Sequence, residues 1–210
     1  MSAGRSSATG GRRRRRSPEV AEQEIIAAAE ELLRERPFRD LTVDEVMRRT
    51  DLSRPSFYVY FRDRHHLVLK VVERLTAESS AQADLWFKTE GRSGAATIRE
   101  ATKGVVEVFA RHGAVLQALA DAAADDPEVE AAHNGALNYF VDMIAGHIER
   151  EVAAGAMLPC NPQETARALA IMNDRYMTTV LGRNPTSDPE TVVETICTIW
   201  VRTLYGDDAG

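Results

Sequence analysis

The chain is poor in cysteine and lacks long apolar runs. Cys160 and Cys197 are its only cysteines in 210 residues. Two cysteines this far apart predict neither a disulfide framework nor a zinc site. No stretch approaches the roughly 18 apolar residues that a membrane helix needs, and no apolar segment follows the N-terminal arginines, as it would in a signal peptide. We therefore expect a cytoplasmic protein that does not enter a membrane.

The chain also lacks the motifs of common active sites. It has no glycine-rich phosphate loop, no nucleophile elbow and no residues at metal-ligand spacing. Asp125 and Asp126 have no evident basic or histidine partner. His65 and His66 are adjacent, so on a helix they diverge by about 100° and cannot chelate one ion; we expect them at the surface or near DNA. We expect no enzyme activity, no metal and no cofactor.

Charge is distributed unevenly along the chain. The net charge is −6, yet residues 1–17 contain six arginines and no acid and so contribute +6. The remainder therefore has a net charge of −12. Residues 39–66 are close to neutral, with six arginines and five acids, so the excess acid lies towards the C-terminus. This division is typical of a protein with a basic end that contacts phosphates and an acidic body that avoids them.

The sequence predicts an all-helical protein. No alternating run typical of a strand persists, and no internal repeat is visible. Apolar residues instead recur at helical spacing, as in Ile25, Ala28, Ala29 and Leu32. Apart from two short helices described next, and a loop at residues 91–94, we expect helices from Pro18 to just before Pro37 and over residues 64–88, 95–111, 114–124, 128–154, 162–181 and 189–204.

Residues 41–67, LTVDEVMRRTDLSRPSFYVYFRDRHHL, have the pattern of two short helices, a tight turn and the start of a third helix. Thr42 and Glu45 form a capping box, in which the Thr42 hydroxyl accepts the Glu45 N–H and the Glu45 carboxylate reaches back. Residues 50–52 make the turn. The order of these elements is that of a helix-turn-helix DNA-binding motif.

The second short helix begins after Ser53, a residue suited to an N-cap, and has Pro55 in its first turn, where no hydrogen bond is lost. Phe57 and Phe61 lie four apart and are expected to be buried together. The other faces are left with the residues Arg54, Ser56, Tyr58 and Tyr60.

The N-terminal side chains of such a helix meet base edges in the major groove. Here they are Ser53, Arg54, Pro55 and Ser56. Hydroxyls suit bases or phosphates, an arginine can form two hydrogen bonds to guanine, and a proline ring can contact a thymine methyl group. These residue types predict base contacts.

Phosphate contacts are expected further along the same segment. The hydroxyls of Tyr58 and Tyr60 are placed to reach phosphate oxygens, which fix the register of a protein on DNA. Asp63 can cap a following helix. The free N–H groups of that helix, with Arg64 beside them, would form a second phosphate site.

The run SRPSFYVYFRDRHHL resembles the signature of TetR-type one-component transcriptional regulators. The resemblance is strong over residues 20–75. Towards the C-terminus, MNDRYMTTVLG (residues 172–182) and IWVRTLYG (residues 199–206) are similar to the branch that contains the ethionamide-resistance repressor. The family implies a homodimer, an all-α subunit of about nine helices, and DNA contacts by the residues Thr42, Ser53, Arg54, Pro55, Ser56, Tyr58, Tyr60 and Arg64. Tyr60 and Arg64 depart from the family's frequent histidine and lysine, although both keep a donor.

The composition and the resemblance together divide the chain into three parts. Residues 1–17 would be a disordered basic arm, residues 18–78 a helix-turn-helix domain, and residues 79–210 a ligand-binding and dimerisation domain. The arm could place its arginines in a minor groove; the alternative is a solvated tail without a role. The arginines concerned are Arg12, Arg13, Arg14, Arg15 and Arg16.

The same branch implies a ligand channel lined by Ile98, Ala101, Val105, Phe109, Leu137, Phe140, Ile144, Asn173 and Trp200. Tyr139 and Tyr176 are further aromatic candidates for its walls. Ligand pockets are mostly apolar with a few placed polar groups, and Asn173 is an amide in apolar sequence. The alternative for each aromatic is ordinary core packing. The ligand should be apolar or amphipathic.

Two apolar stripes in the last helices predict a dimer interface. One stripe is formed by Val192, Ile196, Ile199 and either Val201 or Thr203, and the other by Leu169, Met172, Tyr176 and Val180. Two such helices can pair with their copies in a four-helix interface, as they do in the family. The alternative is that both stripes fill the core of a single subunit.

These features together predict a dimeric transcriptional regulator that binds a palindromic operator in double-stranded DNA. In this family such regulators are most often repressors released by a small-molecule effector. The effector would move the long helix that begins at residue 64 and so change the separation of the two recognition helices. The alternative is a non-specific DNA-coating protein driven by the arginine arm.

Overall fold

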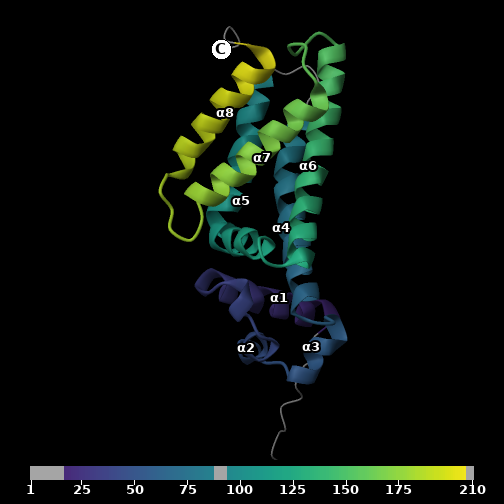
Figure 1. Cartoon of the computed structure of the whole chain (residues 1–210), viewed down its shortest axis with the longest axis vertical. Coiled ribbons are helices and arrows are strands. Elements are labelled where there is room, and N and C mark those ends of the chain that lie inside the picture. Colours follow the sequence, from purple (N-terminus) through teal and green to yellow (C-terminus); the bar gives the residue numbers. More distant parts are fainter. Residues whose placement is uncertain (1–16, 88–93, 207–210) are drawn as a thin grey trace, which may run out of the picture.

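The computed structural model describes residues 17–87 and 94–206. Within these ranges the chain forms eight α-helices and one 3₁₀ helix, with no strand. Helices α1 to α3 lie at one end of the molecule, and α4 and α6 run from that end into the larger body formed with α5, α7 and α8 (Figure 1). The elements are α1 Pro18–Glu35, η1 Phe38–Asp40, α2 Val43–Arg48, α3 Arg54–Tyr60, α4 Arg64–Phe87, α5 Gly94–Ala123, α6 Pro127–Ala153, α7 Pro162–Val180 and α8 Pro189–Tyr205.

Four helices begin in the same way, with a capping residue followed by a proline. Prolines open α1, α6, α7 and α8. In each case the side chain of the residue before accepts a backbone N–H from the first turn. Proline suits this position because its missing N–H would have no partner there. The four capping residues are Ser17, Asp126, Asn161 and Asp188.

The described residues form two hydrophobic cores that share α5. The core under α1 to α4 includes Val115, Ala118 and Leu119 from the second half of α5. The core of the larger body includes Ile98 and other residues from the first half of the same helix, up to Phe109. Helix α5 therefore joins the end formed by α1 to α3 to the rest of the molecule.

The expectation of separate helices over 95–111 and 114–124 was wrong, because α5 continues through both. This accounts for eight α-helices in the described ranges rather than about nine. Gly113 lies between the two expected helices, and it packs closely against another segment. A Cβ atom there would lie 1.9 Å from the carbonyl oxygen of Leu181, just after α7. Residues 91–93 of the expected loop lie outside the described residues, and Gly94 is already helical.

The close approach at Gly113 can be tested by Gly113→Ala. The added methyl group must push the chain after α7 away from α5, so we expect the free energy of unfolding to fall by about 1–3 kcal/mol. Urea denaturation measures this. The matched control is Gly135→Ala in α6, where an added Cβ meets nothing within 4 Å; it should instead stabilise the helix by up to about 1 kcal/mol. Equal effects of the two substitutions would contradict the packing role of Gly113.

Candidate DNA-recognition helix and ligand cavity

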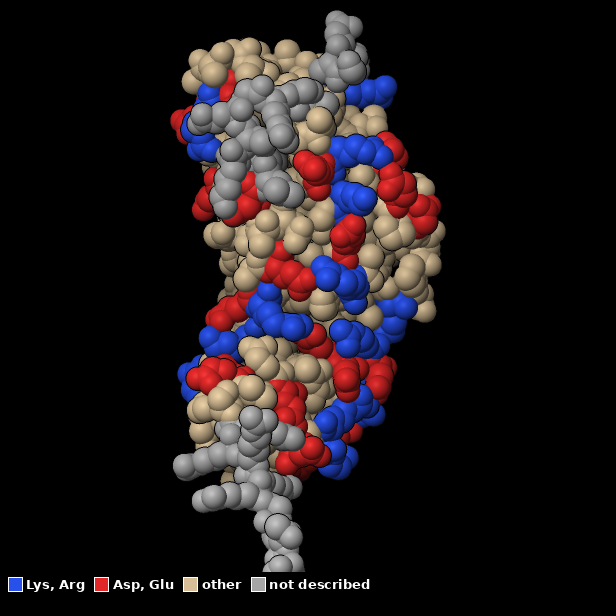
Figure 2. Space-filling model, turned by 180° about the vertical axis from the view of Figure 1, so that it is seen from behind, with Lys and Arg blue, Asp and Glu red and all other residues tan. Residues whose placement is uncertain are grey.

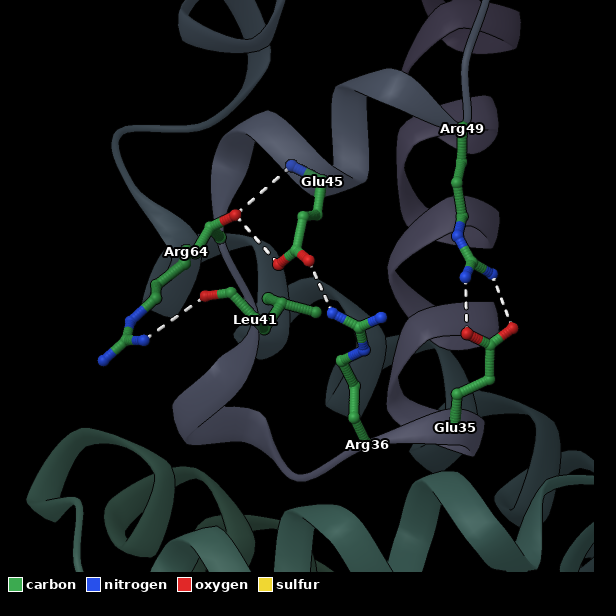
Figure 3. Close-up of polar contacts among 7 residues, drawn as sticks. Glu35, Arg36, Leu41, Glu45, Arg49 and Arg64 are labelled. Carbon is green, nitrogen blue, oxygen red and sulfur yellow. Dashed lines mark hydrogen bonds and ion pairs between the residues drawn. The ribbon is translucent and has the colours of Figure 1, made fainter.

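The start of α2 is fixed by the predicted cap and by an added ion pair. The Thr42 hydroxyl accepts the N–H of Glu45 at 3.3 Å, as the capping box predicts. The Glu45 carboxylate does not reach back to the backbone; it accepts from the Thr42 hydroxyl at 3.0 Å and pairs with Arg36 (Figure 3). The hydrogen bond from Thr42, with the nearby arginines, lowers the pKa of Glu45. This chain of contacts ties α2 to the end of α1.

Further polar contacts hold the turn between α2 and α3 against α1. Arg49 forms two hydrogen bonds with the carboxylate of Glu35 (Figure 3). The Asp51 N–H donates to Glu24 at 2.9 Å. Because both acids belong to α1, the turn has a fixed position relative to the first helix.

Arg64, expected at a phosphate, also has a role within the protein. Its Nη1 donates to the carbonyl oxygens of Arg39 and Leu41, at 3.2 and 3.3 Å. Its guanidinium group lies 4.9 Å from the ring centroid of Phe38, a favourable cation–π distance. These contacts hold the segment before α2, and the phosphate contact remains a prediction.

Helix α3 is anchored by aromatic rings on one side and open on the other. Phe57 and Phe61 are fully buried, with ring centroids 5.3 Å apart, as the spacing predicted. On the opposite side Tyr58 is 54% exposed and Val59 is 75% exposed. A short helix with this anchor can project from the domain without losing its position.

The N-terminus of α3 differs from the sequence-based expectation in one detail. Ser53 is at the N-cap position, but its side chain makes no capping hydrogen bond. Its hydroxyl lies 2.9 Å from that of Ser56 instead. Beside it, Nε of Arg54 contacts Oδ1 of Asp44 in α2 at 2.7 Å. Both side chains of this ion pair are more than half exposed, so the pair can exchange for another partner at little cost.

The predicted DNA contacts in the described residues lie at the start of α2, along α3 and at the start of α4. Thr42, Ser53, Arg54, Pro55 and Tyr58 are exposed, and Ser56, Tyr60 and Arg64 are partly buried. On the face seen in Figure 2, basic and acidic side chains are interspersed around this end of the molecule. Arg12, Arg13, Arg14, Arg15 and Arg16 lie outside the described residues.

A buried carboxylate joins α1 to α4 and α5. Glu30 in α1 has a side chain only 4% exposed and pairs with Arg74 of α4. Nδ1 of His112, from α5, lies 3.9 Å from the same carboxylate. Its Nε2 lies 3.5 Å from Glu78 of α4. Burial lowers the pKa of His112. This cluster fixes the DNA-binding end against the two helices that continue into the body.

A second polar contact at the same junction corrects two sequence-based interpretations. Asp126 does have a histidine partner, because Nε2 of His65 lies 2.7 Å from its Oδ2. His65 is therefore not a free surface residue; its ring also packs edge-on against Phe38. Although burial alone would raise the pKa of Asp126, hydrogen bonds from the Val129 N–H and from His65 lower it. The residues are 61 positions apart, so no local pattern indicates this pair.

The larger body contains a cavity of about 160 Å³ between five helices, α4 to α8. All nine residues expected to line a channel do line it: Ile98, Ala101, Val105, Phe109, Leu137, Phe140, Ile144, Asn173 and Trp200. Tyr139 is not among its walls and is 47% exposed, and Tyr176 does not line it either. The cavity is similar in size to an engineered apolar cavity of about 150 Å³ that binds benzene.

Several residues of the cavity wall were missed from the sequence. Helix α4 contributes Val72, Thr76, Ser79 and other residues. Helices α6 and α7 contribute His133 and Asp174, whose Nε2 and Oδ2 lie 3.3 Å apart. Asn173 is not a free amide, because its Oδ1 accepts the indole N–H of Trp200 at 3.2 Å. Only the adjacency of Asp174 to Asn173 in the sequence could have drawn attention to the pair.

Comparison with known proteins agrees with this geometry. The family model "Bacterial regulatory proteins, tetR family" matches residues 25–71, and "Transcriptional regulator EthR, C-terminal domain" matches residues 98–206. The HTH-type transcriptional regulator EthR of Mycobacterium tuberculosis is 32% identical over 187 residues, which cover 86% of this chain and 85% of that protein. The chain belongs to the TetR family. Its C-terminal domain is of the EthR type.

Other relatives extend the comparison. EthR of Mycolicibacterium smegmatis is 28% identical over 180 residues, 85% of this chain and 83% of that protein. Among solved structures, a TetR-family regulator from Syntrophomonas wolfei has a TM-score of 0.77 at 12% identity, covering 88% of this chain and 94% of that one. The regulatory protein TetR from Rhodobacter sphaeroides has a TM-score of 0.66 at 24% identity, covering 85% and 98%. The structures show that the TetR fold is shared.

The TetR-family assignment makes the chain a helix-turn-helix transcriptional regulator; the family is one of regulators, not of enzymes. Across residues 17–87 and 94–206, no three His, Cys, Asp or Glu side chains come together as a metal site would require. Over the same ranges, every helix is too short or too polar to cross a bilayer.

The junction of the two domains can be tested by Glu30→Gln. The substitution leaves Arg74 without its buried partner. Because the Arg74 side chain is 37% exposed, we expect a loss of about 1–3 kcal/mol in the free energy of unfolding rather than the full effect of a buried pair. The control is Glu73→Gln, which breaks the exposed pair with Lys70 and should change stability by under about 1 kcal/mol. If the two variants unfold alike in urea, Glu30 does not hold the junction.

Proposed function

We propose that this TetR-family chain is a homodimeric repressor that reads a palindromic operator and leaves it when a small apolar or amphipathic effector binds. In this proposal residues 18–78 bind DNA, residues 79–210 bind the effector and form the dimer, and residues 1–17 are a basic arm. The protein would act in the cytoplasm. The observation that best supports it is the exposed N-terminus of α3 beside a fully buried aromatic anchor.

To recognise a DNA sequence, Arg54 would have to leave Asp44 and bind a base. Its ion pair with Asp44 is exposed and local, so a guanine edge can replace the carboxylate and offer two acceptors in one plane. Tyr58 is directed away from the buried side of α3 and can reach a phosphate. The contacts within the domain keep α3 in place while Arg54 moves.

A homodimer is supported by apolar residues that α7 and α8 leave exposed. Ile171 is 48% exposed and Ile199 is 37% exposed. Ile171 was not in the predicted stripes. Of the stripe residues, Val192, Ile196 and Leu169 are buried in the subunit's own core, whereas Met172, Tyr176 and Val180 are only partly buried against it. The interface would therefore use the outer faces of these two helices. Two copies joined there can place two recognition helices on one side of a palindromic site.

Effector control is supported by the contribution of α4 to the cavity. The residues Val72, Thr76 and Ser79 lie in the wall, and the same helix begins directly after α3. A ligand larger than this cavity of about 160 Å³ can displace one of the five helices that line it. Displacement of α4 changes the position of α3, and the coupling must then lower DNA affinity and effector affinity by the same factor.

Selection of bound DNA from a random pool tests the proposal directly. We expect a palindrome, because two identical recognition helices read inverted half-sites. Deleting residues 1–16 should lower the affinity while the selected sequence stays preferred. A non-specific DNA-coating protein would instead return no consensus and would lose nearly all binding with its arginines, since phosphate contacts dominate such binding.

The contact assignment for α3 has its own test in gel retardation with the selected operator. We expect Arg54→Ala to weaken binding about 10- to 100-fold, in line with roughly 1–3 kcal/mol for a base contact, and Tyr58→Phe to weaken it less. The thermal midpoints should hardly change, because both side chains are exposed. Asp44→Asn is the matched control: it also breaks the ion pair but leaves the guanidinium free, so binding should be kept or tightened. If the Arg54→Ala variant retards the operator DNA as strongly as the wild type does, the contact assignment is wrong.

A further inference from the structure

The cavity wall contains one ionisable pair that the family resemblance did not indicate. Among the described residues that line the cavity, His133 and Asp174 are the only ones with side chains that titrate. His133 comes from α6 and Asp174 from α7, and their Nε2 and Oδ2 atoms lie 3.3 Å apart. The two side chains are 28% and 29% exposed. The remaining walls are apolar or bear neutral polar groups.

The pair offers a ligand one acceptor and one donor, and it has no net charge when both members are ionised. The hydrogen bond that His133 donates to Asp174 raises the pKa of His133 above its ordinary value, although burial opposes this. The contact between them uses Nε2 and Oδ2. In the described contacts Nδ1 of His133 and Oδ1 of Asp174 have no other hydrogen bond, so both remain available to a bound molecule.

The chemistry of the pair discriminates between polar groups. A ligand carboxylate would be attracted by His133 but repelled by Asp174, whose oxygen is only 3.3 Å from the imidazole. A ligand ammonium group would be attracted by Asp174 but repelled by a protonated His133. A hydroxyl or a primary amide can donate to Oδ1 or accept from Nδ1, and either contact brings no unpaired charge to the pair.

We propose that the His133–Asp174 pair selects an effector with a small apolar body and a neutral head that both donates and accepts hydrogen bonds. This inference rests on the proposed effector role of the cavity and adds the class of ligand. The cavity volume of about 160 Å³ has room for an apolar body of about one six-membered ring. The rival explanation is that the pair only fastens α6 to α7.

The test compares four probes that share one ring: benzyl alcohol, benzoate, benzylammonium and toluene. Binding to the full chain is measured by calorimetry at neutral pH for the wild type, Asp174→Asn and His133→Gln. In the wild type we expect benzyl alcohol to bind at least about tenfold more tightly than either ion. Toluene reports on the apolar walls alone and should bind all three proteins equally.

Each variant should strengthen the binding of one charged probe relative to benzyl alcohol. Asp174→Asn leaves a histidine that can bear a positive charge, so benzoate should gain about tenfold relative to benzyl alcohol. His133→Gln leaves the carboxylate alone, so benzylammonium should gain by a similar factor. If the pair only fastens the two helices, both variants will lower the thermal midpoint while the order of the probes stays unchanged, and the inference is overturned.

The same experiment separates this inference from the proposed function. If the probes follow the expected order but do not release operator DNA, the pair recognises ligands and the effector mechanism fails. If toluene and benzyl alcohol bind none of the three proteins, the cavity is not a site for such molecules, and both proposals are overturned.

Discussion

The contact between α5 and the end of α7 constrains the whole molecule. Gly113 leaves no room between these backbones, because a Cβ atom there would overlap the Leu181 carbonyl oxygen. On one side of this point α5 belongs to the core of the larger body, and on the other side it belongs to the core under α1 to α4. The two domains therefore cannot move independently without bending or sliding a shared helix. Interiors are close-packed, so such a helix has few alternative positions.

The recognition helix α3 is held by its contacts with the rest of the domain rather than by its own stability. Seven residues are too few for a helix to persist alone in water. Two buried rings, Phe57 and Phe61, supply the packing, while polar contacts from α1 and Arg64 hold the flanking segments. None of these contacts uses the N-terminal face of α3. Within residues 17–87 and 94–206, the side chains there pair only with each other or with Asp44, so the face expected to meet DNA is available without loss of the fold.

The parts that were predictable from the sequence are those determined by neighbouring residues. Helices were predicted to begin at residues 18, 162 and 189, as α1, α7 and α8 do, and the capping box located α2. Contacts between distant segments were not predictable in this way. A break was expected between residues 111 and 114, where Gly113 in fact packs against Leu181, and Asp126 had no visible partner although His65 contacts it. The nine cavity positions came from resemblance to a family, not from periodicity. His133 and Asp174 were missed because their meeting depends on how α6 packs against α7.

The same two turns of helix α4 contribute residues to the cavity wall and to the domain junction. Val72, Thr76 and Ser79 line the cavity, while Arg74 and Glu78 contact the cluster around Glu30 and His112. Residues on different faces of one helix move together, so a displacement that enlarges the cavity must also alter the ion pair that fixes α1. The polar cluster is sensitive to such movement, because the attraction of a buried carboxylate for its partner falls as their separation grows. An effector in this cavity would therefore act on the DNA-binding end through the ion pairs of α4, and the strength of the Glu30 contacts would set how much binding energy the effector must supply.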